Sequence, residues 1–183
     1  MNNVRTLIDL VESKSRKKKL ELLPLEYTRS ALDPVLSKKT LDLHYGRLAK
    51  GYVDRYNKKE GDPEFNEAGA FLHNILFAQF RAPSNDNEPN NLVAAIIRRK
   101  FGNYKKFTKE FTEEALSIQG SGWIYLSKSG SIKTIVNHEI RNDILLLVDW
   151  WEHAFIIDYG SDKKRYLENT WKIIDWDVIN KRL

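Results

Sequence analysis

The residues with the clearest capacity for chemistry are one aspartate and a set of histidines. Asp149 and His153 are four residues apart and directly follow the most apolar stretch of the chain, residues 144–148. A carboxylate at a strand end and an imidazole one turn later can point at the same spot. His44 and His73 each stand among apolar residues in separate helical stretches. Three imidazoles and a carboxylate suit iron, manganese or zinc better than calcium or magnesium.

The spacing of these residues leaves a second interpretation open. A histidine on an apolar helix face is often a hydrogen-bonded core residue, and the Asp-x-x-x-His pattern alone is weakly specific. The chain has four histidines, of which His138 is the remaining one, and it has no cysteine. A thiolate metal site, a cysteine nucleophile and a disulfide framework are therefore excluded, and any imidazole chemistry depends on those four rings.

The composition predicts a folded protein inside a cell. Of the 183 residues, 42% are hydrophobic, and Trp, Tyr and Phe are too frequent for a disordered chain. No stretch approaches 18 uncharged apolar residues and no secretory signal is visible, so we expect no membrane segment and an intracellular location. The net charge is +5, but residues 1–25 carry six cations and three carboxylates. Nucleic-acid binding by the remaining body is therefore not expected.

Residues 1–22 are predicted to form a basic N-terminal arm. Four apolar residues recur at helical spacing from Val4 to Val11, and a basic run follows from Lys14 to Lys19. Such a run is usually a solvated tether, but it also fits a docking arm for an acidic partner. The arm is our candidate for contacts in a larger assembly.

The apolar pattern predicts two helices that form an antiparallel hairpin, residues 23–81. The first helix is expected over residues 40–58 and the second over residues 63–81. Between them, Gly61-Asp62-Pro63 is a strong helix break. His44 and Tyr52 fall on the apolar face of the first helix, and His73 falls within the second.

A polar, Asn-rich linker at residues 82–91 precedes a second lobe, residues 92–183. We expect helices over residues 92–101 and 104–118, three strands over residues 123–128, 132–138 and 144–149, and short helical segments after residue 151. The predicted fold class is α+β: an N-terminal α-helical hairpin followed by a C-terminal lobe with a three-stranded antiparallel sheet packed by helices.

Several motifs in this order resemble the iron/manganese superoxide dismutase family. Leu41-Asp42-Leu43-His44-Tyr45-Gly46 is similar to the family's first ligand helix, and Phe65-Asn66-Glu67-Ala68-Gly69, leading to His73, resembles the second. Gln119-Gly120-Ser121-Gly122-Trp123 is similar to the middle region. Asp149-Trp150-Trp151-Glu152-His153-Ala154 matches the most specific signature, Asp-x-Trp-Glu-His-Ala. The resemblance extends from about Leu23 to Leu183.

The resemblance implies a redox-metal enzyme that disproportionates superoxide to oxygen and hydrogen peroxide. It implies one iron or manganese ion per chain, with a proton-relaying gateway tyrosine at Tyr52. His138 falls where some members place a histidine that hydrogen-bonds solvent beside the ion. At the alternative place for such a group, on the second helix, this chain has Gly69 or Ala70. The metal ligands implied are His44, His73, Asp149 and His153, and the pocket-wall residues are Trp123, Trp151 and Phe77.

The resemblance also implies a homodimer, but with an altered contact. Glu152 matches a family residue that bridges to the opposite subunit. Leu48 and Ile156 stand where the family usually has a histidine and a tyrosine that pair across this contact. Loss of both polar partners together can be nearly neutral for stability, so we expect these two residues still to meet at the dimer contact. Such divergence leaves an alternative function open, a superoxide-dismutase fold recruited as a structural subunit of a large assembly.

Overall fold

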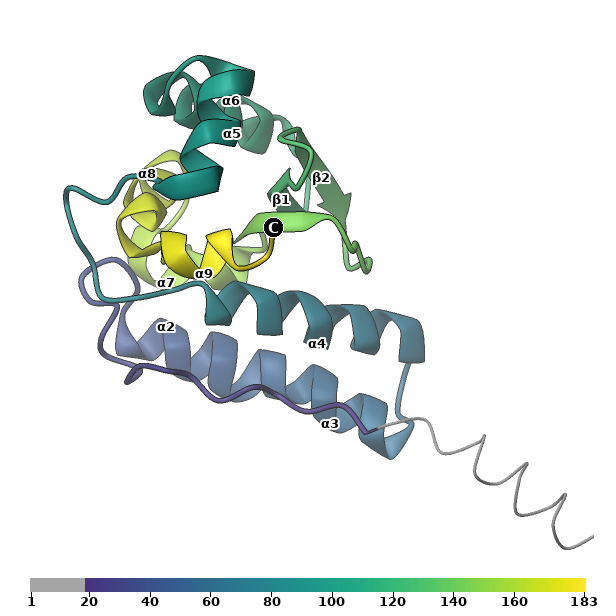
Figure 1. Ribbon diagram of the computed structural model, residues 1–183. Helices are drawn as coiled ribbons and strands as arrows, with labels where there is room; N and C mark the ends of the chain where they lie inside the picture. Colours follow the sequence, from purple (N-terminus) through teal and green to yellow (C-terminus); the bar gives the residue numbers. More distant parts are fainter. Residues whose placement is uncertain (1–18) are drawn as a thin grey trace, which may run out of the picture.

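The computed structural model describes residues 19–183 (Figure 1). The helix predicted near Val4–Val11 and most of the basic run lie outside these residues. Residues 19–22 run along the helical hairpin, where the backbone of Leu20 makes two hydrogen bonds of 2.9 Å with the side chain of Asn57. None of the helices in the described part of the chain is long and apolar enough to cross a membrane.

The first arm of the hairpin is one helical run in three segments. Helix α2 (Lys38–Leu43) continues into the π-helical segment η1 (His44–Ala49) and then into α3 (Lys50–Lys58). Ser37 caps the start, because its hydroxyl accepts a hydrogen bond from the backbone N–H of Thr40. The predicted helix is confirmed, but its π-helical middle was not predicted. Such wider turns are frequent at functional sites, and this one begins at His44.

The second arm of the hairpin is helix α4 (Pro63–Ala78). Asp62 caps it by accepting the N–H of Phe65, and Pro63 occupies the first turn, where its missing N–H is not needed. The prediction that this helix reaches residue 81 is wrong. Gln79 leaves helical geometry and bonds the backbone of Leu147, while Phe80 pairs with Ile174. These tertiary contacts replace the last helical turn.

The second lobe starts with two helices, α5 (Asn91–Phe101) and α6 (Tyr104–Ser117). Gly102 between them has a φ of 84°, which favours glycine, and Asn103 caps α6 by accepting the N–H of Lys106. The segment before α5 is held by Asn87, whose buried amide donates to the carbonyls of Trp171 and Ile174.

The sheet has three antiparallel strands, as predicted, and their order, which the sequence did not predict, is β2-β1-β3. They are β1 (Gly122–Ser127), β2 (Ile132–Val136) and β3 (Ile144–Asp149), and the register pairs Trp123 with Asp149. Every residue of β1 and β3 is buried, whereas the edge strand β2 is half exposed. Strand β2 ends two residues earlier than predicted, since Asn137 has a φ of 54°.

Short helical segments complete the chain after β3 (Figure 1). They are η2 (Glu152–Ala154), α7 (Ile156–Tyr159), α8 (Lys163–Thr170), η3 (Trp171–Ile173) and α9 (Trp176–Asn180). One buried cluster joins the two lobes, and it includes Leu72 and Leu76 of α4 together with the sheet. Truncation of a fully buried leucine here would cost about 2–5 kcal/mol. The packing of α4 against the sheet therefore fixes the position of one lobe relative to the other.

Candidate metal centre

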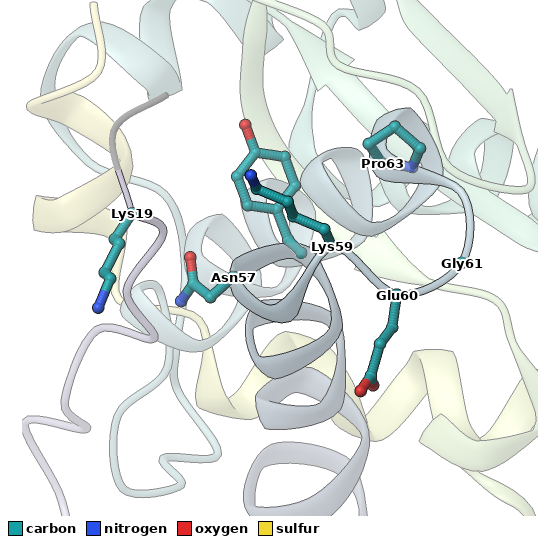
Figure 2. A pocket seen from close by; sticks show the side chains of 7 residues that line it. Lys19, Asn57, Lys59, Glu60, Gly61 and Pro63 are labelled. Atoms are coloured by element: carbon teal, nitrogen blue, oxygen red, sulfur yellow. The ribbon is translucent and has the colours of Figure 1, made fainter. Parts of the chain in front are cut away.

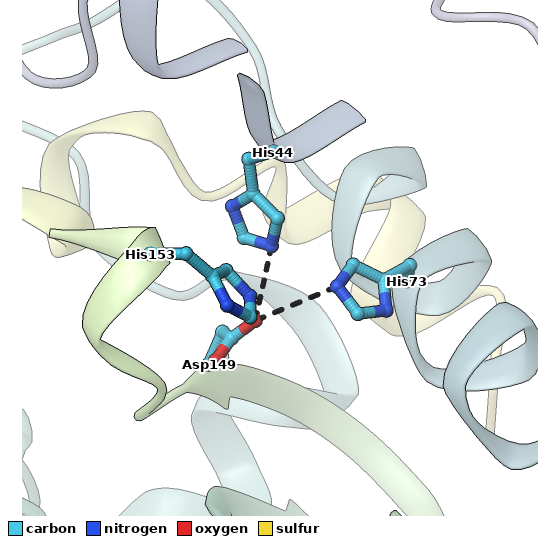
Figure 3. A group of neighbouring side chains, drawn as sticks. All are labelled: His44, His73, Asp149 and His153. Atoms are coloured by element: carbon cyan, nitrogen blue, oxygen red, sulfur yellow. Dashed lines mark ion pairs between the residues drawn. The ribbon is translucent and has the colours of Figure 1, made fainter. Parts of the chain in front are cut away.

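Four potential ligands meet where the two lobes join (Figure 3). His44 opens η1, His73 lies in α4, Asp149 ends β3 and His153 lies in η2. One donor atom from each residue lies within 4.8 Å of the other three. Oδ2 of Asp149 is 3.0 Å from Nε2 of His44, 3.3 Å from Nε2 of His153 and 3.8 Å from Nε2 of His73.

Hydrogen bonds orient two of these donors, those of His73 and Asp149, toward the group. Nδ1 of His73 donates to the carbonyl of Gly69 at 2.7 Å, so in the neutral ring Nε2 presents its lone pair. Oδ1 of Asp149 accepts the N–H of Trp151 at 2.7 Å, which leaves Oδ2 facing the histidines. The hydroxyl of Tyr166 donates to the carbonyl of Asp149 at 3.1 Å. The sequence interpretation missed these orienting partners, although Gly69 stands four residues before His73, at helical spacing.

The four inward atoms have no hydrogen-bond partner among the described residues. They are Nε2 of His44, His73 and His153 and Oδ2 of Asp149. Their side chains are buried, with His153 the most accessible at 15%. Leaving such buried polar atoms unpaired costs about 1–3 kcal/mol each. A single cation among them would satisfy all four, and a set of three imidazoles and one carboxylate fits iron or manganese.

Burial and the contacts among the four side chains set the protonation states that a cation needs. It lowers the pKa of His44 and lowers that of His73 well below the ordinary value, so both rings stay neutral. For Asp149, burial acts to raise the pKa, but the adjacent imidazoles of His153 and His44 hold it well below its usual range. Neutral imidazoles and an ionised carboxylate are the metal-binding forms of these ligands.

Tyr52, His138 and Trp123 form a hydrogen-bonded chain beside the four ligands. Nε1 of Trp123 donates to Nδ1 of His138 at 3.1 Å, and Nε2 of His138 lies 2.8 Å from the hydroxyl of Tyr52. Because the indole N–H can only donate, His138 accepts on Nδ1 and, as a neutral ring, donates from Nε2 to Tyr52. Burial lowers the pKa of His138 to about 4, and burial, with the charge of Asp149, raises that of Tyr52 to about 12.

Gly69 is required by the position of Tyr52. A Cβ at this position would lie 2.8 Å from the Tyr52 ring, closer than real Cβ contacts. Hence α4 has no room for a side chain here, and the polar group that reaches Tyr52 comes from His138, on the loop after β2. The His138 ring is also packed against Phe65, with centroids 4.6 Å apart.

Three aromatic residues enclose the group of ligands. Trp123 meets His73 edge-on with centroids 5.1 Å apart, and Phe77 lies 4.9 Å from His44. Trp151 stacks on His138 at 4.8 Å and on His153 at 5.8 Å. The structure thus places all three predicted pocket-wall residues against the predicted ligands.

The three predicted dimer-contact residues are not among the inward donors. Glu152 is exposed and precedes His153 in η2, Leu48 is half-buried in η1, and Ile156 at the start of α7 is 46% exposed. An aliphatic side chain exposed to this degree is available for contact with another molecule.

Comparison with family models matches both lobes of the chain. The alpha-hairpin domain of iron/manganese superoxide dismutases matches residues 19–71, and the C-terminal domain of the same family matches residues 89–182. The two matches cover most of the chain and leave residues 1–18 outside.

Curated relatives carry corresponding names. An iron superoxide dismutase of Bacteroides fragilis is 34% identical over 89% of this chain and 98% of its own length. A manganese/iron superoxide dismutase of Porphyromonas gingivalis is 34% identical over 88% of this chain and 98% of its own. An iron superoxide dismutase of Coxiella burnetii is 31% identical over 88% of this chain and 96% of its own length.

Proposed function

Because this chain belongs to the iron/manganese superoxide dismutase family, we propose that it converts two superoxide ions and two protons into one dioxygen and one hydrogen peroxide. The observation that carries this proposal is the group of four buried donor atoms, from three distant parts of the chain, that lack any other partner in the described structure. A structural protein would gain no stability from such a group.

His44, His73, Asp149 and His153 would hold one iron or manganese ion per chain. When bound, the ion supplies a one-electron couple between its trivalent and divalent states. With a single carboxylate among neutral imidazoles, the charge of a trivalent ion is only partly balanced, which favours entry of an anion. The aromatic walls restrict the number of water molecules that compete for this space.

Tyr52 and His138 would supply and hold protons for the reaction. Since Nε2 of His138 donates to the Tyr52 oxygen, the Tyr52 proton is free to be donated to a substrate on its other side. Trp123 fixes the His138 ring so that this direction is maintained. Both groups are neutral at physiological pH, given their pKa values of about 12 and about 4.

Replacing the carboxylate tests the proposal directly. We expect Asp149→Asn to bind substoichiometric metal and to lose superoxide consumption, while the same change at the exposed Asp86 leaves both unchanged. Metal content by mass spectrometry and superoxide decay by absorbance measure the two effects. Full metal loading and wild-type turnover in Asp149→Asn would refute the assignment.

Two further proposals concern assembly and organisation. We propose a homodimer with Glu152, Leu48 and Ile156 at its contact, and an intracellular location. We keep the division into an arm (1–22), a hairpin domain (23–81), a linker (82–91) and a C-terminal domain (92–183). The alternative of a structural subunit in a large assembly, joined through residues 1–22, has no support among the relatives, whose names describe superoxide dismutases.

A further inference from the structure

A groove of about 580 Å³ runs between the start of α4 and the loop that follows β2. Asp62, Glu64 and Glu67 line it on the helix side. Val136 and Ile140 line it on the loop side, and these aliphatic side chains are 72% and 41% exposed. The groove therefore combines a row of carboxylates with an uncovered apolar floor.

The carboxylates of the groove are only partly balanced. Glu139, also in the lining, pairs with Arg141 at 2.7 Å. Within residues 19–183, neither Glu64 nor Glu67 forms an ion pair, and no lysine or arginine lines the groove. Carboxylates near the start of a helix stabilise it. This effect accounts for the acidic residues at the start of α4, but it does not balance their charge with a cation. An occupant that complements this surface must be both basic and apolar.

The segment of this chain that precedes residue 19 has that chemistry. Residues 1–18 carry five cations and two carboxylates, and three of the cations are consecutive, Arg16 to Lys18. Earlier in the same segment, four apolar residues recur at helical spacing between Val4 and Val11. Both family models leave this segment outside their matches, so it is not needed to complete the fold described above.

The attachment point of this segment lies next to the groove. Lys19 lines a cavity of about 330 Å³ at the hairpin tip together with Gly61 and Pro63 (Figure 2). Asp62 and Glu64, which flank Pro63, belong to the groove. Eighteen residues span up to about 60 Å when extended, which is enough to reach the groove. The order of the residues also suits the groove, because the basic run is next to Lys19 in the sequence and the apolar residues are farther from it.

We propose that residues 1–18 dock in this groove on their own subunit, with Arg16–Lys18 against Glu64 and Glu67 and the apolar residues on Val136 and Ile140. The docked segment covers the exposed aliphatic floor and offsets the negative charge of the rim.

The groove also borders the catalytic region. His138 forms part of its wall and contacts Tyr52 on the other side. An acidic rim repels an anionic substrate, so a docked basic segment makes the approach more favourable. This consequence rests on the proposed function, whereas the docking itself does not.

Cross-linking tests the docking without any use of activity. The chain has no cysteine, so Val11→Cys combined with Val136→Cys introduces one defined pair. We expect a disulfide within one chain to form under mild oxidation at least fivefold faster than in the matched pair Val11→Cys with Lys58→Cys. Lys58 is exposed near the same tip but outside the groove. Equal rates would overturn the proposal, and disulfides only between chains would assign the groove to a second copy.

A charge exchange tests the role of the carboxylates. Lys17→Glu with Lys18→Glu should slow the Val11–Val136 cross-link by about fivefold, as expected for two exposed ion pairs. Adding Glu64→Lys and Glu67→Lys should restore the rate. If the variant with all four charge substitutions unfolds at the wild-type temperature but its cross-linking rate does not recover, the proposed pairing is contradicted.

Removal of residues 1–18 tests the consequence for the substrate. We expect a fall in kcat/KM for superoxide of up to about tenfold at low salt, which disappears at high salt, with metal content unchanged. A cross-link that forms normally in a chain without superoxide activity would refute the proposed function and leave the docking intact.

Discussion

Nε2 of His138 lies 2.8 Å from the hydroxyl of Tyr52, although 86 residues separate the two in the chain. Tyr52 comes from α3 in the hairpin, and His138 comes from the loop after β2 in the second lobe. The proton route proposed above therefore requires the two lobes to be docked against each other. A substitution of either residue should therefore affect proton delivery more strongly than metal binding.

Tyr52→Phe should keep the metal and lose most of the turnover. The ring, which packs 5.3 Å from His73, is preserved, but the proton at its tip is removed. A positioned proton donor contributes about 10²–10⁴ in rate, so we expect kcat to fall at least tenfold. Tyr125→Phe, which removes a hydroxyl bonded to Asp143, is the matched control. Stopped-flow superoxide decay measures both, and equal rates for the two variants would contradict the role of Tyr52.

His138→Gln should be far milder than His138→Leu. A glutamine can accept from Nε1 of Trp123 and donate to Tyr52, whereas leucine leaves a buried indole N–H unpaired, at about 1–3 kcal/mol. We expect the glutamine variant to retain activity within about tenfold and the leucine variant to lose both activity and stability. Similar activity in the two variants would mean that the hydrogen-bonded chain is irrelevant to turnover.

Metal-free protein should lose stability as the pH falls below about 6.5. Burial lowers the pKa of His44, His73 and His138 in the folded state, so the unfolded chain binds protons that the folded chain does not. Each such proton contributes a slope of about 1.4 kcal/mol per pH unit, present from about 6.5 down towards the folded-state pKa. Full stability therefore lies above pH 6.5.

Urea unfolding at several pH values, followed by tryptophan fluorescence, measures that slope. His138→Gln should reduce it by the contribution of one proton, which provides the internal control. Bound metal should lower the pH at which a fixed urea concentration unfolds half of the protein, because the ion stabilises the folded state and competes with protons for the same nitrogens. A midpoint pH unaffected by metal would be inconsistent with the four-ligand site.

Ile156→Glu should favour monomers if Ile156 lies at the dimer contact. A charge at a 46% exposed position costs little in the monomer but is unfavourable when desolvated in an interface. Leu92→Glu introduces the same charge at a position that is 63% exposed on α5 and serves as the control. Sedimentation velocity distinguishes the outcomes, and an unchanged dimer in Ile156→Glu would place the contact elsewhere.

Gly69→Ala should destabilise the protein, whereas Gly51→Ala should not. The added methyl group at residue 69 meets the Tyr52 ring at 2.8 Å, an overpacking expected to cost about 1–3 kcal/mol. At residue 51 it meets only the flexible end of Arg55, at 3.0 Å, and alanine is the better helix former. Thermal unfolding of the two variants should shift in opposite directions.

The sequence predicted the elements of the fold well because local patterns determine them. The break at Gly61-Asp62-Pro63 and the apolar periodicity predicted the hairpin, and the short connections between apolar stretches predicted three strands, but they did not predict that β1 lies between β2 and β3. The early end of α4 was not predictable, since it depends on Gln79 bonding to Leu147 on a strand 68 residues away.

The site was predictable to a different extent. Residue types indicated a metal site, but their convergence could be expected only from the family resemblance. The resemblance implied a role for His138 beside the ion, whereas its bond to Tyr52 and the loss of side-chain space at Gly69 emerge from the packing of the two lobes. Contacts between side chains of distant segments cannot be predicted from the apolar periodicity of any one segment.

The π-helical segment η1 changes the direction in which Tyr52 points, relative to His44, around the axis of the hairpin's first arm. In a regular α-helix each residue advances about 100°, so Tyr52, eight positions after His44, would sit about 80° past the direction of that imidazole. A wider winding over the six residues His44–Ala49 advances less per residue and rotates Tyr52 back into alignment. Rewinding this segment as an ordinary α-helix of the same length would carry the phenol about 80° away from the direction of the imidazole. Deleting one residue between His44 and Ala49 would instead leave Tyr52 seven positions after His44, only about 20° out of alignment, so the wide turn accommodates one additional residue without separating the two side chains.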